Sequence, residues 1–439
     1  MNLESGLIWP TRALALQRLV RSAMGVKELA RPTYFVHQTH RRFNQKFTTA
    51  ERKAWDAFGQ SLSHNIQKNK KITARKRLPG YTLIDRALAD AAQTIPESFD
   101  MDVIRPNSGF LSWSPLKEPT HEALGMRIRD FDKDTMTQSI KKIAIWFGAS
   151  LVGITFLERR WVYSHWYDKW SSPNRNPQIV FSDEPGFEKH KTPTQLEDGT
   201  QIIPKDMIYV ISLGFEMDYD SMRTAPTAIA QAGTYMYGYR TVIQTVASLA
   251  EFIRGLGFTA IPSANDTALS IPLAINAGLG EDARYGGIIT PEFGPRLRLA
   301  KIITNMPLSV DRPVTFGIHD FCEQCKKCAR NCPVRAIPFG PRTTGLVKND
   351  VDAPTVSENI GALRWVKNGE RCATYFSLLG TNCGICIRVC PWNKPRNAVH
   401  SFPKYLAING GSLIRRTLVE LDNILGYGKS MNPDEWWGL

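Results

Sequence analysis

Cysteines are the residues in this sequence whose type and spacing most directly suggest chemistry, and there are eight of them. Four lie in the run CEQCKKCARNCP, in which Cys322, Cys325, Cys328 and Cys332 precede Pro333. This is the C-x2-C-x2-C-x3-C-P spacing of bacterial ferredoxins, in which three cysteines bind one [4Fe–4S] cluster and the fourth binds another. The run therefore predicts iron–sulfur clusters and one-electron transfer.

The remaining four cysteines supply a second motif. CGICIRVCP contributes Cys383, Cys386 and Cys390, and Cys372 lies upstream in place of the missing first cysteine. We assign Cys322, Cys325, Cys328 and Cys390 to one cluster, and Cys372, Cys383, Cys386 and Cys332 to the other. Zinc sites usually show two C-x2-C halves without further cysteines at these offsets, and disulfides would not require two C-x3-C-P endings. Two [4Fe–4S] clusters use every cysteine in the chain.

The composition sets the limits for the rest of the molecule. A chain of 439 residues is long enough for two or three domains, and 43% hydrophobic with 22% charged residues is ordinary for a globular protein. The net charge of +14 fits nucleic acid, an anionic membrane face or an anionic cofactor. We interpret the densest basic patch, residues 68–77, as a solvated surface. Uncharged runs such as residues 224–239 reach only 16 residues, whereas a membrane-spanning helix needs about 20.

Hydrophobic periodicity predicts a mainly helical region up to about residue 120 and an alternating α/β pattern from about residue 134. We expect helices over residues 136–146, 229–255, 269–277 and 413–425, and strands over residues 151–156, 207–215 and 258–262, with a strand–loop–strand over 288–307. The helix over 229–255 carries one apolar stripe, made by Tyr235, Tyr239, Val242, Val246, Leu249 and Ile253. About 320 residues precede the cysteine motifs, too many for a simple electron carrier, so the residues alone indicate a reductase with a further, unidentified cofactor.

Several other stretches carry a family resemblance. They are WVYSHW (161–166), AEFIRGLGFTAIPSAN (250–265), AGLGEDARYGGIITPEFGPRLRL (277–299), TNMPL (304–308), FCEQCKKCARNCP (321–333) and NCGICIRVCPW (382–392). From about residue 81 to the second cysteine motif, the chain resembles the corrinoid-dependent reductive dehalogenases. The resemblance implies removal of halide from an organohalide such as a chlorinated ethene. The reductant would be cob(I)alamin without its nucleotide base on cobalt, which receives electrons from the two [4Fe–4S] clusters.

The resemblance also implies a fold and roles for individual residues. The fold would be α+β, with a nitroreductase-like α/β core that binds cobalamin and a bacterial ferredoxin-like domain that binds both clusters. Tyr239 matches the family's catalytic proton donor, Arg298 its basic partner, and Asn265 its pocket asparagine. The aromatic residues Tyr81, Tyr235 and Trp365 would line the substrate pocket, and Ser263 and Thr290 would contact the cobalamin.

We expect four regions along the chain: a helical N-terminal region (1–125), the cobalamin-binding core (126–312), the two-cluster domain (313–400) and a helical C-terminal tail (401–439). The family implies a small membrane-anchor protein and an external electron donor as partners, on the outer face of the cytoplasmic membrane. The N-terminus lacks the features of a signal peptide, so the chain is either processed or cytoplasmic. Nucleic acid is not expected as a partner, and a homodimer remains open.

Two other functions compete with this interpretation. Epoxyqueuosine reductases pair the same cofactors and act on tRNA, which would suit the basic charge. That family typically has an aspartate at the position of Tyr239 and often helical repeats at its C-terminus, and neither is present here. A non-enzymatic electron carrier or corrinoid-handling module is the third alternative. Dechlorination assayed with a strong artificial electron donor would separate the three.

Overall fold

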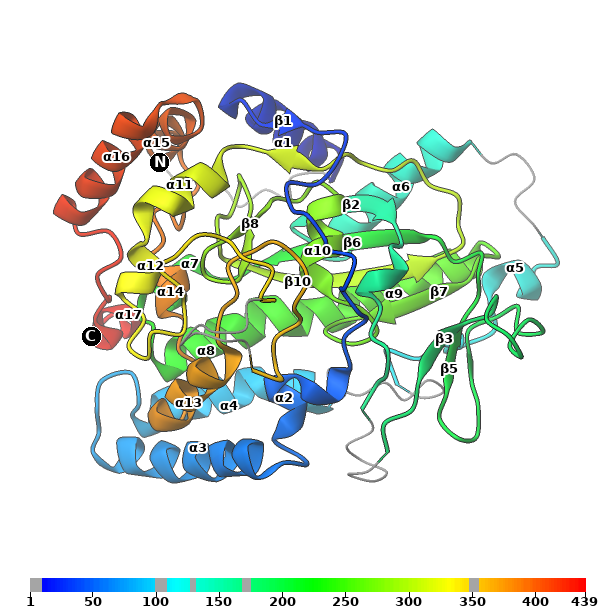
Figure 1. The fold of residues 1–439 in the computed structure, drawn as a ribbon, viewed down its shortest axis with the longest axis horizontal. Helices are drawn as coiled ribbons and strands as arrows, with labels where there is room; N and C mark the ends of the chain where they lie inside the picture. Colours follow the sequence, from blue (N-terminus) through cyan, green and yellow to red (C-terminus); the bar gives the residue numbers. More distant parts are fainter. Residues whose placement is uncertain (1–9, 99–108, 127–131, 168–174, 347–354) are drawn as a thin grey trace.

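The computed structural model describes residues 10–98, 109–126, 132–167, 175–346 and 355–439 (Figure 1). At its centre lies an antiparallel four-stranded sheet in the order β2-β6-β10-β7. The strands are β2 (Leu151–Phe156), β6 (Tyr209–Glu216), β7 (Ala260–Ser263) and β10 (Leu297–Thr304). Their aliphatic and β-branched residues favour strands, and the central strands β6 and β10 are largely buried on both faces. The predicted strands over 151–156, 207–215 and 258–262 are therefore confirmed to within two residues at each end, and the predicted strand–loop–strand over 288–307 contains β10, which ends at Thr304.

The long predicted helix is interrupted. α8 (Ala228–Gly233) leads into a π-helical turn (Thr234–Tyr239), and α9 (Arg240–Gly255) follows. The prediction of one regular helix over 229–255 was wrong, because a π-helical turn inserts one residue into the α-helical pattern without a hydrophobic signal of its own. The predicted stripe is nevertheless confirmed: Val242 and the aliphatic residues after it are buried, and Tyr235 and Tyr239 pack against the same core.

Helices surround the sheet. The described helices before it are α1 (Pro10–Met24), α2 (Thr49–Arg52), α3 (Ala57–Arg75), α4 (Leu83–Ser98), α5 (Thr120–Ala123) and α6 (Lys133–Trp146). Thr48 caps α2 by accepting a hydrogen bond from Glu51 N at 3.3 Å. Later in the chain come α7 (Tyr219–Arg223) and α10 (Ser270–Asn276). The element α6 begins three residues before the predicted helix and ends with it at Trp146.

Smaller sheets complete the fold. β3 (Ile179–Phe181), β5 (Gln201–Ile203) and β4 (Thr194–Gln195) form a three-stranded sheet, and β8 (Glu281–Ala283) pairs with β9 (Gly287–Ile289). β1 (Lys27–Glu28) pairs with β11 (Val314–Thr315), so the N-terminal region reaches the segment that leads into the first cysteine motif. The domain boundaries expected from the sequence stay predictions.

The cysteine motifs lie on short helices that the C-terminal helices cover. The helices are α11 (Ile318–Cys325), α12 (Lys327–Arg330), α13 (Gly369–Leu379), α14 (Ile385–Arg388), α15 (Ala398–Asn409), α16 (Ser412–Ile424) and α17 (Pro433–Trp437). Asp422 of α16 pairs with Lys327, 2.5 Å away, and with Lys394, which joins the tail to both motifs. In the part of the chain described, no helix is both long and apolar enough to cross a bilayer.

Candidate active site and iron–sulfur sites

The eight cysteines fall into two groups of four. Burial and the neighbouring thiols of Cys386, Cys372 and Cys332 raise the pKa of Cys383 to about 12. The pKa of Cys390 is raised by burial and by the thiols of Cys322 and Cys325. Cys328 lies near Cys322, Cys390, Cys386 and Cys325, so the two groups approach each other at Cys328 and Cys386.

These groups match the crossed assignment expected from spacing. We call Cys322, Cys325, Cys328 and Cys390 the first quartet, and Cys332, Cys372, Cys383 and Cys386 the second quartet. A thiol whose pKa is raised by burial remains protonated at neutral pH unless a cation stabilises its thiolate. Iron would supply that charge, although which iron each thiol binds stays a prediction.

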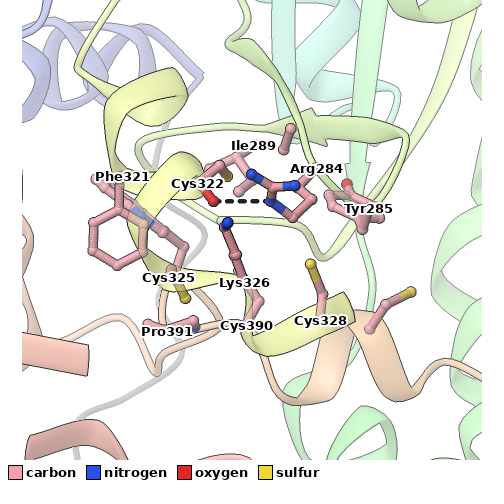
Figure 2. A pocket seen from close by; sticks show the side chains of 13 residues that line it. Arg284, Tyr285, Ile289, Phe321, Cys322, Cys325, Lys326, Cys328, Cys390 and Pro391 are labelled. Carbon is pink, nitrogen blue, oxygen red and sulfur yellow. Dashed lines mark hydrogen bonds between the residues drawn. The ribbon is translucent and has the colours of Figure 1, made fainter. Parts of the chain in front are cut away.

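A small hollow, lined by all four cysteines of the first quartet, opens between these side chains (Figure 2). Arg284 is fully buried on its wall and donates from Nε to the carbonyl oxygen of Cys322 at 2.9 Å. Trp392 also lines the hollow, and its buried Nε1 has no hydrogen-bond partner among the described residues. A buried donor without a partner costs free energy, and a cluster sulfide in the hollow would accept its hydrogen bond. The donor set and the hollow therefore fit an iron–sulfur cluster.

The arrangement does not suit a single metal ion. Four thiolates on one zinc would lie about 3.8 Å apart, since each Zn–S bond is about 2.3 Å. Within the described ranges, no three His, Cys, Asp or Glu side chains lie close enough to hold one ion. A four-iron cube holds its thiolates further apart than one zinc ion does.

A second site is built around Tyr239, at the end of the π-helical turn. Its hydroxyl accepts a hydrogen bond from Asn265 Nδ2 at 3.5 Å. The Arg298 guanidinium lies over its ring, with Cζ 5.0 Å from the centroid. The ring of Tyr235 lies 5.4 Å from that of Tyr239. Asn265 is exposed and Tyr239 is half-buried, so a small molecule could reach the hydroxyl. The structure thus brings together four of the residues predicted from the sequence.

Strand alternation explains how Arg298 reaches Tyr239. Alternate residues of a strand point to the same face, and Arg298 shares its face with Ala300 and Ile302, which pack in the core with α9. Close approach also requires Gly238, because a Cβ there would lie 2.6 Å from Arg298 Cγ. The buried Arg298 Nε has no hydrogen-bond partner among the described residues, so this donor is available to a bound group.

The loop that carries Asn265 is held from behind by a buried lysine. Lys301, on the opposite face of β10 from Arg298, is fully buried and donates from Nζ to Ala264 O at 2.8 Å and to Ser270 Oγ at 3.1 Å. The buried carboxylate of Asp266 accepts from Ala264 N at 2.6 Å. Thr267 adopts φ of +61°, a strained conformation for a β-branched residue that persists only where surrounding contacts enforce it. These contacts fix the backbone on both sides of Asn265.

Lys301→Met should destabilise this loop. The change preserves side-chain length but leaves the Ala264 carbonyl and the Ser270 hydroxyl without their buried donor, at a cost of about 2–3 kcal/mol. We expect the thermal midpoint of the holoprotein to fall by several degrees and turnover to fall with it, because Asn265 loses its fixed position. Lys142→Met, at an exposed position of α6, is the control. Equal midpoints for both variants would contradict a supporting role for Lys301.

The other two residues predicted for the substrate pocket, Tyr81 and Trp365, lie elsewhere. The hydroxyl of Tyr81 donates to the Pro226 carbonyl, and burial, Tyr375 and Cys383 raise its pKa to about 12, which places it beside the second quartet. Trp365 is 1% exposed and packs in the core of the first quartet, with Arg284 Cζ 4.8 Å from its ring centroid. Neither Tyr81 nor Trp365 therefore belongs to the hydrophobic core around Tyr239, and their roles in the substrate pocket stay predictions.

The two residues predicted to contact cobalamin have fully buried side chains that bond within their own loops. Ser263 Oγ donates to Asp266 O at 2.8 Å, and Thr290 Oγ1 accepts from Phe293 N at 3.1 Å. Their cobalamin contacts stay predictions. Sequence reasoning missed Arg284 and Lys301, which are both buried cations. Arg284 stands in a stretch that bore the family resemblance, which was the available signal, whereas Lys301 lies between two such stretches.

Comparison with known proteins identifies the region that holds the cysteines. Residues 321–393 match the model of a 4Fe-4S double cluster binding domain. Over 368 residues the chain is 36% identical to the tetrachloroethene reductive dehalogenase of Sulfurospirillum multivorans, which covers 80% of this chain and 70% of that protein. The chain belongs to the reductive dehalogenase family. Its [4Fe–4S] domain therefore accounts for all eight cysteines, and the assignment of this chain to the oxidoreductases follows.

Other members of the family are longer than this chain. The tetrachloroethene reductive dehalogenase of Desulfitobacterium hafniense is 33% identical over 340 residues, which are 74% of this chain but only 60% of that protein. A solved reductive dehalogenase, described as suggesting a mechanism for B12-dependent dehalogenation, superposes with a TM-score of 0.65 at 23% identity. That match covers 96% of this chain and 52% of the solved chain, and it shows a shared fold.

Proposed function

We propose that this reductive dehalogenase removes halide from an organohalide, such as a chlorinated ethene, with a corrinoid cofactor and electrons from two [4Fe–4S] clusters. The single observation that carries the proposal is the group formed by Tyr239, Arg298 and Asn265 in a chain that also holds both cysteine quartets. Relatives named for tetrachloroethene favour a small, apolar, chlorinated substrate. We further propose that the α/β core is nitroreductase-like.

The residues around Tyr239 suit a corrinoid. The rim of a corrinoid ring carries amide groups that accept hydrogen bonds. Arg298 Nε is a buried donor without a partner among the described residues, so it suits such an acceptor. The buried Tyr285 lines the hollow at the first quartet, together with Cys386 of the second quartet. When bound and reduced, the corrinoid supplies the strongly reducing, nucleophilic cobalt needed to break a carbon–halogen bond.

The chain's own residues then handle the proton. Reductive removal of halide consumes two electrons and one proton, R–X + 2e⁻ + H⁺ → R–H + X⁻. We assign the proton to the Tyr239 hydroxyl, since a phenol is a far stronger acid than the C–H bond that forms. Asn265 orients the hydroxyl oxygen, and the cationic Arg298 beside the ring favours the phenolate left behind. Tyr235 narrows the approach to this hydroxyl.

Arg298→Leu should reduce turnover by about tenfold, which corresponds to about 1.4 kcal/mol of lost transition-state stabilisation. The change removes the charge that favours the phenolate but leaves the donor in place. In the Arg298→Leu, Tyr239→Phe double variant, the combined loss should be smaller than the product of the single losses, because both residues serve one proton transfer. Steady-state turnover of all three variants measures this coupling, and losses that simply multiply would separate Arg298 from the proton step.

Partners and location are proposed on the same basis. We propose a small membrane-anchor protein, an external electron donor and a location on the outer face of the cytoplasmic membrane. The experiment for the function itself is a halide-release screen of the holoprotein across chlorinated and brominated ethenes and phenols, with a strong artificial electron donor. Release from at least one compound supports the proposal, and no release from any compound by protein with a full cofactor complement would refute it.

A further inference from the structure

Three helices form an exposed face that the proposed chemistry does not use. The end of α3, the start of α4 and the end of α13 lie side by side at one end of the molecule (Figure 1). Asn69 Nδ2 donates to Ser377 O at 2.8 Å, and Arg86 of α4 donates to Gly380 O at 2.6 Å. The contact is close, because a Cβ at Gly380 would lie 2.4 Å from Lys70 N. We call the exposed surface of these three segments the α3–α13 face.

The α3–α13 face carries exposed apolar side chains and exposed cations, and we call the cations its rim. Five large apolar side chains are exposed on it: Ile72 (37%), Leu78 (42%), Leu83 (81%), Ile84 (58%) and Leu378 (58%). Beside them lie the exposed cations Lys68, Lys71, Arg75, Lys76 and Arg77. Exposed apolar groups gathered within a polar rim are typical of protein interaction sites.

Charge on this face has one sign. Residues 57–84 contain no acidic residue, and neither do residues 371–419, the stretch that includes most of α13 and the second cysteine motif. Asp90 of α4 is paired with Lys70 at 2.5 Å. The acidic Asp434 and Glu435 of α17 lie at the border of this face, because the neighbouring Pro433 packs closely against Gly80. A surface of this kind attracts an acidic partner at long range.

The face lies over the second quartet. Cys372 is in the first turn of α13 and Cys383 follows its end, so Leu378 stands about 9 Å along the helix axis from Cys372. No cysteine of the second quartet is fully buried, whereas two cysteines of the first quartet, Cys322 and Cys325, are buried and the other two are intermediate. The second quartet is therefore the more accessible of the two to an outside electron donor.

We propose that the α3–α13 face docks a small acidic electron-carrier protein, and that electrons enter the chain through the cluster of the second quartet. The proposal deepens the proposed function, which requires two electrons for each halide released. The carrier class is a reduced, acidic iron–sulfur protein of low potential, which gives up one electron per encounter and is itself oxidised. Encounters of this kind use small interfaces and depend on electrostatic attraction.

The test is a charge reversal compared with a matched control. The variant Lys71→Glu, Arg75→Glu, Lys76→Glu changes the rim, and Lys133→Glu, Lys142→Glu, Lys189→Glu makes the same change in net charge at exposed lysines elsewhere. Stopped-flow absorbance follows cluster reduction by a reduced acidic ferredoxin, without organohalide, at several salt concentrations. We expect the rim variant to be reduced about tenfold or more slowly at low salt and to lose most of its salt dependence, whereas the control stays near wild type.

Reduced methyl viologen, a small cationic donor, separates docking from cluster damage. It should reduce both variants as fast as wild type. The proposal would be overturned if ferredoxin reduced both variants equally slowly, or if it reduced the rim variant as fast as wild type. So would normal ferredoxin reduction together with loss of binding to anionic lipid vesicles, which would make the face a membrane contact. Since reduction is measured without substrate, failure of dehalogenation would not obscure the result.

Discussion

Tyr239→Phe is expected to lower turnover by about 10²-fold or more, while folding, iron content and corrinoid binding remain normal. The phenylalanine ring preserves the packing against the α9 core and beneath Arg298, so only the hydroxyl is lost. If Tyr239 were only a core residue, loss of its one hydrogen bond, from Asn265, would cost about 1 kcal/mol of stability and leave turnover almost unchanged. Halide release under anaerobic conditions distinguishes the two roles directly.

Tyr235→Phe is the matched control for this experiment. Tyr235 belongs to the same π-helical turn, and its ring lies 5.4 Å from that of Tyr239. A residue that only lines the pocket should alter turnover by a few fold at most. If Tyr239→Phe kept most of its turnover with a full cofactor complement, Tyr239 would be a core residue without a catalytic role. If Tyr235→Phe lost as much turnover as Tyr239→Phe, the proton donor could not be assigned to Tyr239 alone.

Cys390→Ala should abolish turnover by removing one ligand from the first quartet. We expect iron to fall from about eight to about four atoms per chain, because a four-iron cluster on three cysteines is readily lost. Cys390 lies far from the first motif in sequence, but its thiol is grouped with Cys322 and Cys325. Iron analysis and electron paramagnetic resonance of the reduced protein measure the outcome.

Cys383→Ala provides the comparison, since its thiol neighbours are Cys386, Cys372 and Cys332. Each variant should keep the paramagnetic signal that the other one loses, and the two surviving signals together should reproduce the wild-type spectrum. Loss of the same cluster in both variants would show that the second motif binds one cluster by itself and that the crossed assignment is wrong.

Local patterns were sufficient to predict much of the fold. β2 occupies the residues expected from its apolar run, and α16 begins and ends within one residue of the predicted helix, because burial of a strand or of one helix face leaves a clear period in the sequence. The cysteine quartets were also predictable, since ferredoxin spacing specifies which thiols converge. Family resemblance, and not periodicity, brought Tyr239, Arg298 and Asn265 together.

Other features depend on contacts between distant segments and left no local signal. The π-helical turn includes Gly238, which lies close against Arg298 on β10, and no window of sequence reveals that contact. Nothing in the sequence around Lys301 distinguishes it from a surface lysine, but it lies fully buried beneath the Asn265 loop. The basic residues 68–77 were interpreted as a solvated surface, and only the packing of α3 on α13 places them near the second quartet.

Halide release by corrinoid-loaded and corrinoid-free preparations, each with about eight irons per chain, tests the central claim most directly. Both samples receive the same organohalide and the same low-potential donor under anaerobic conditions. The loaded protein should release halide over many turnovers and consume two electrons per halide, and the corrinoid-free protein should release none. Equal release from both samples, or no release from fully loaded protein, would contradict the assignment of this chain as a corrinoid-dependent reductive dehalogenase.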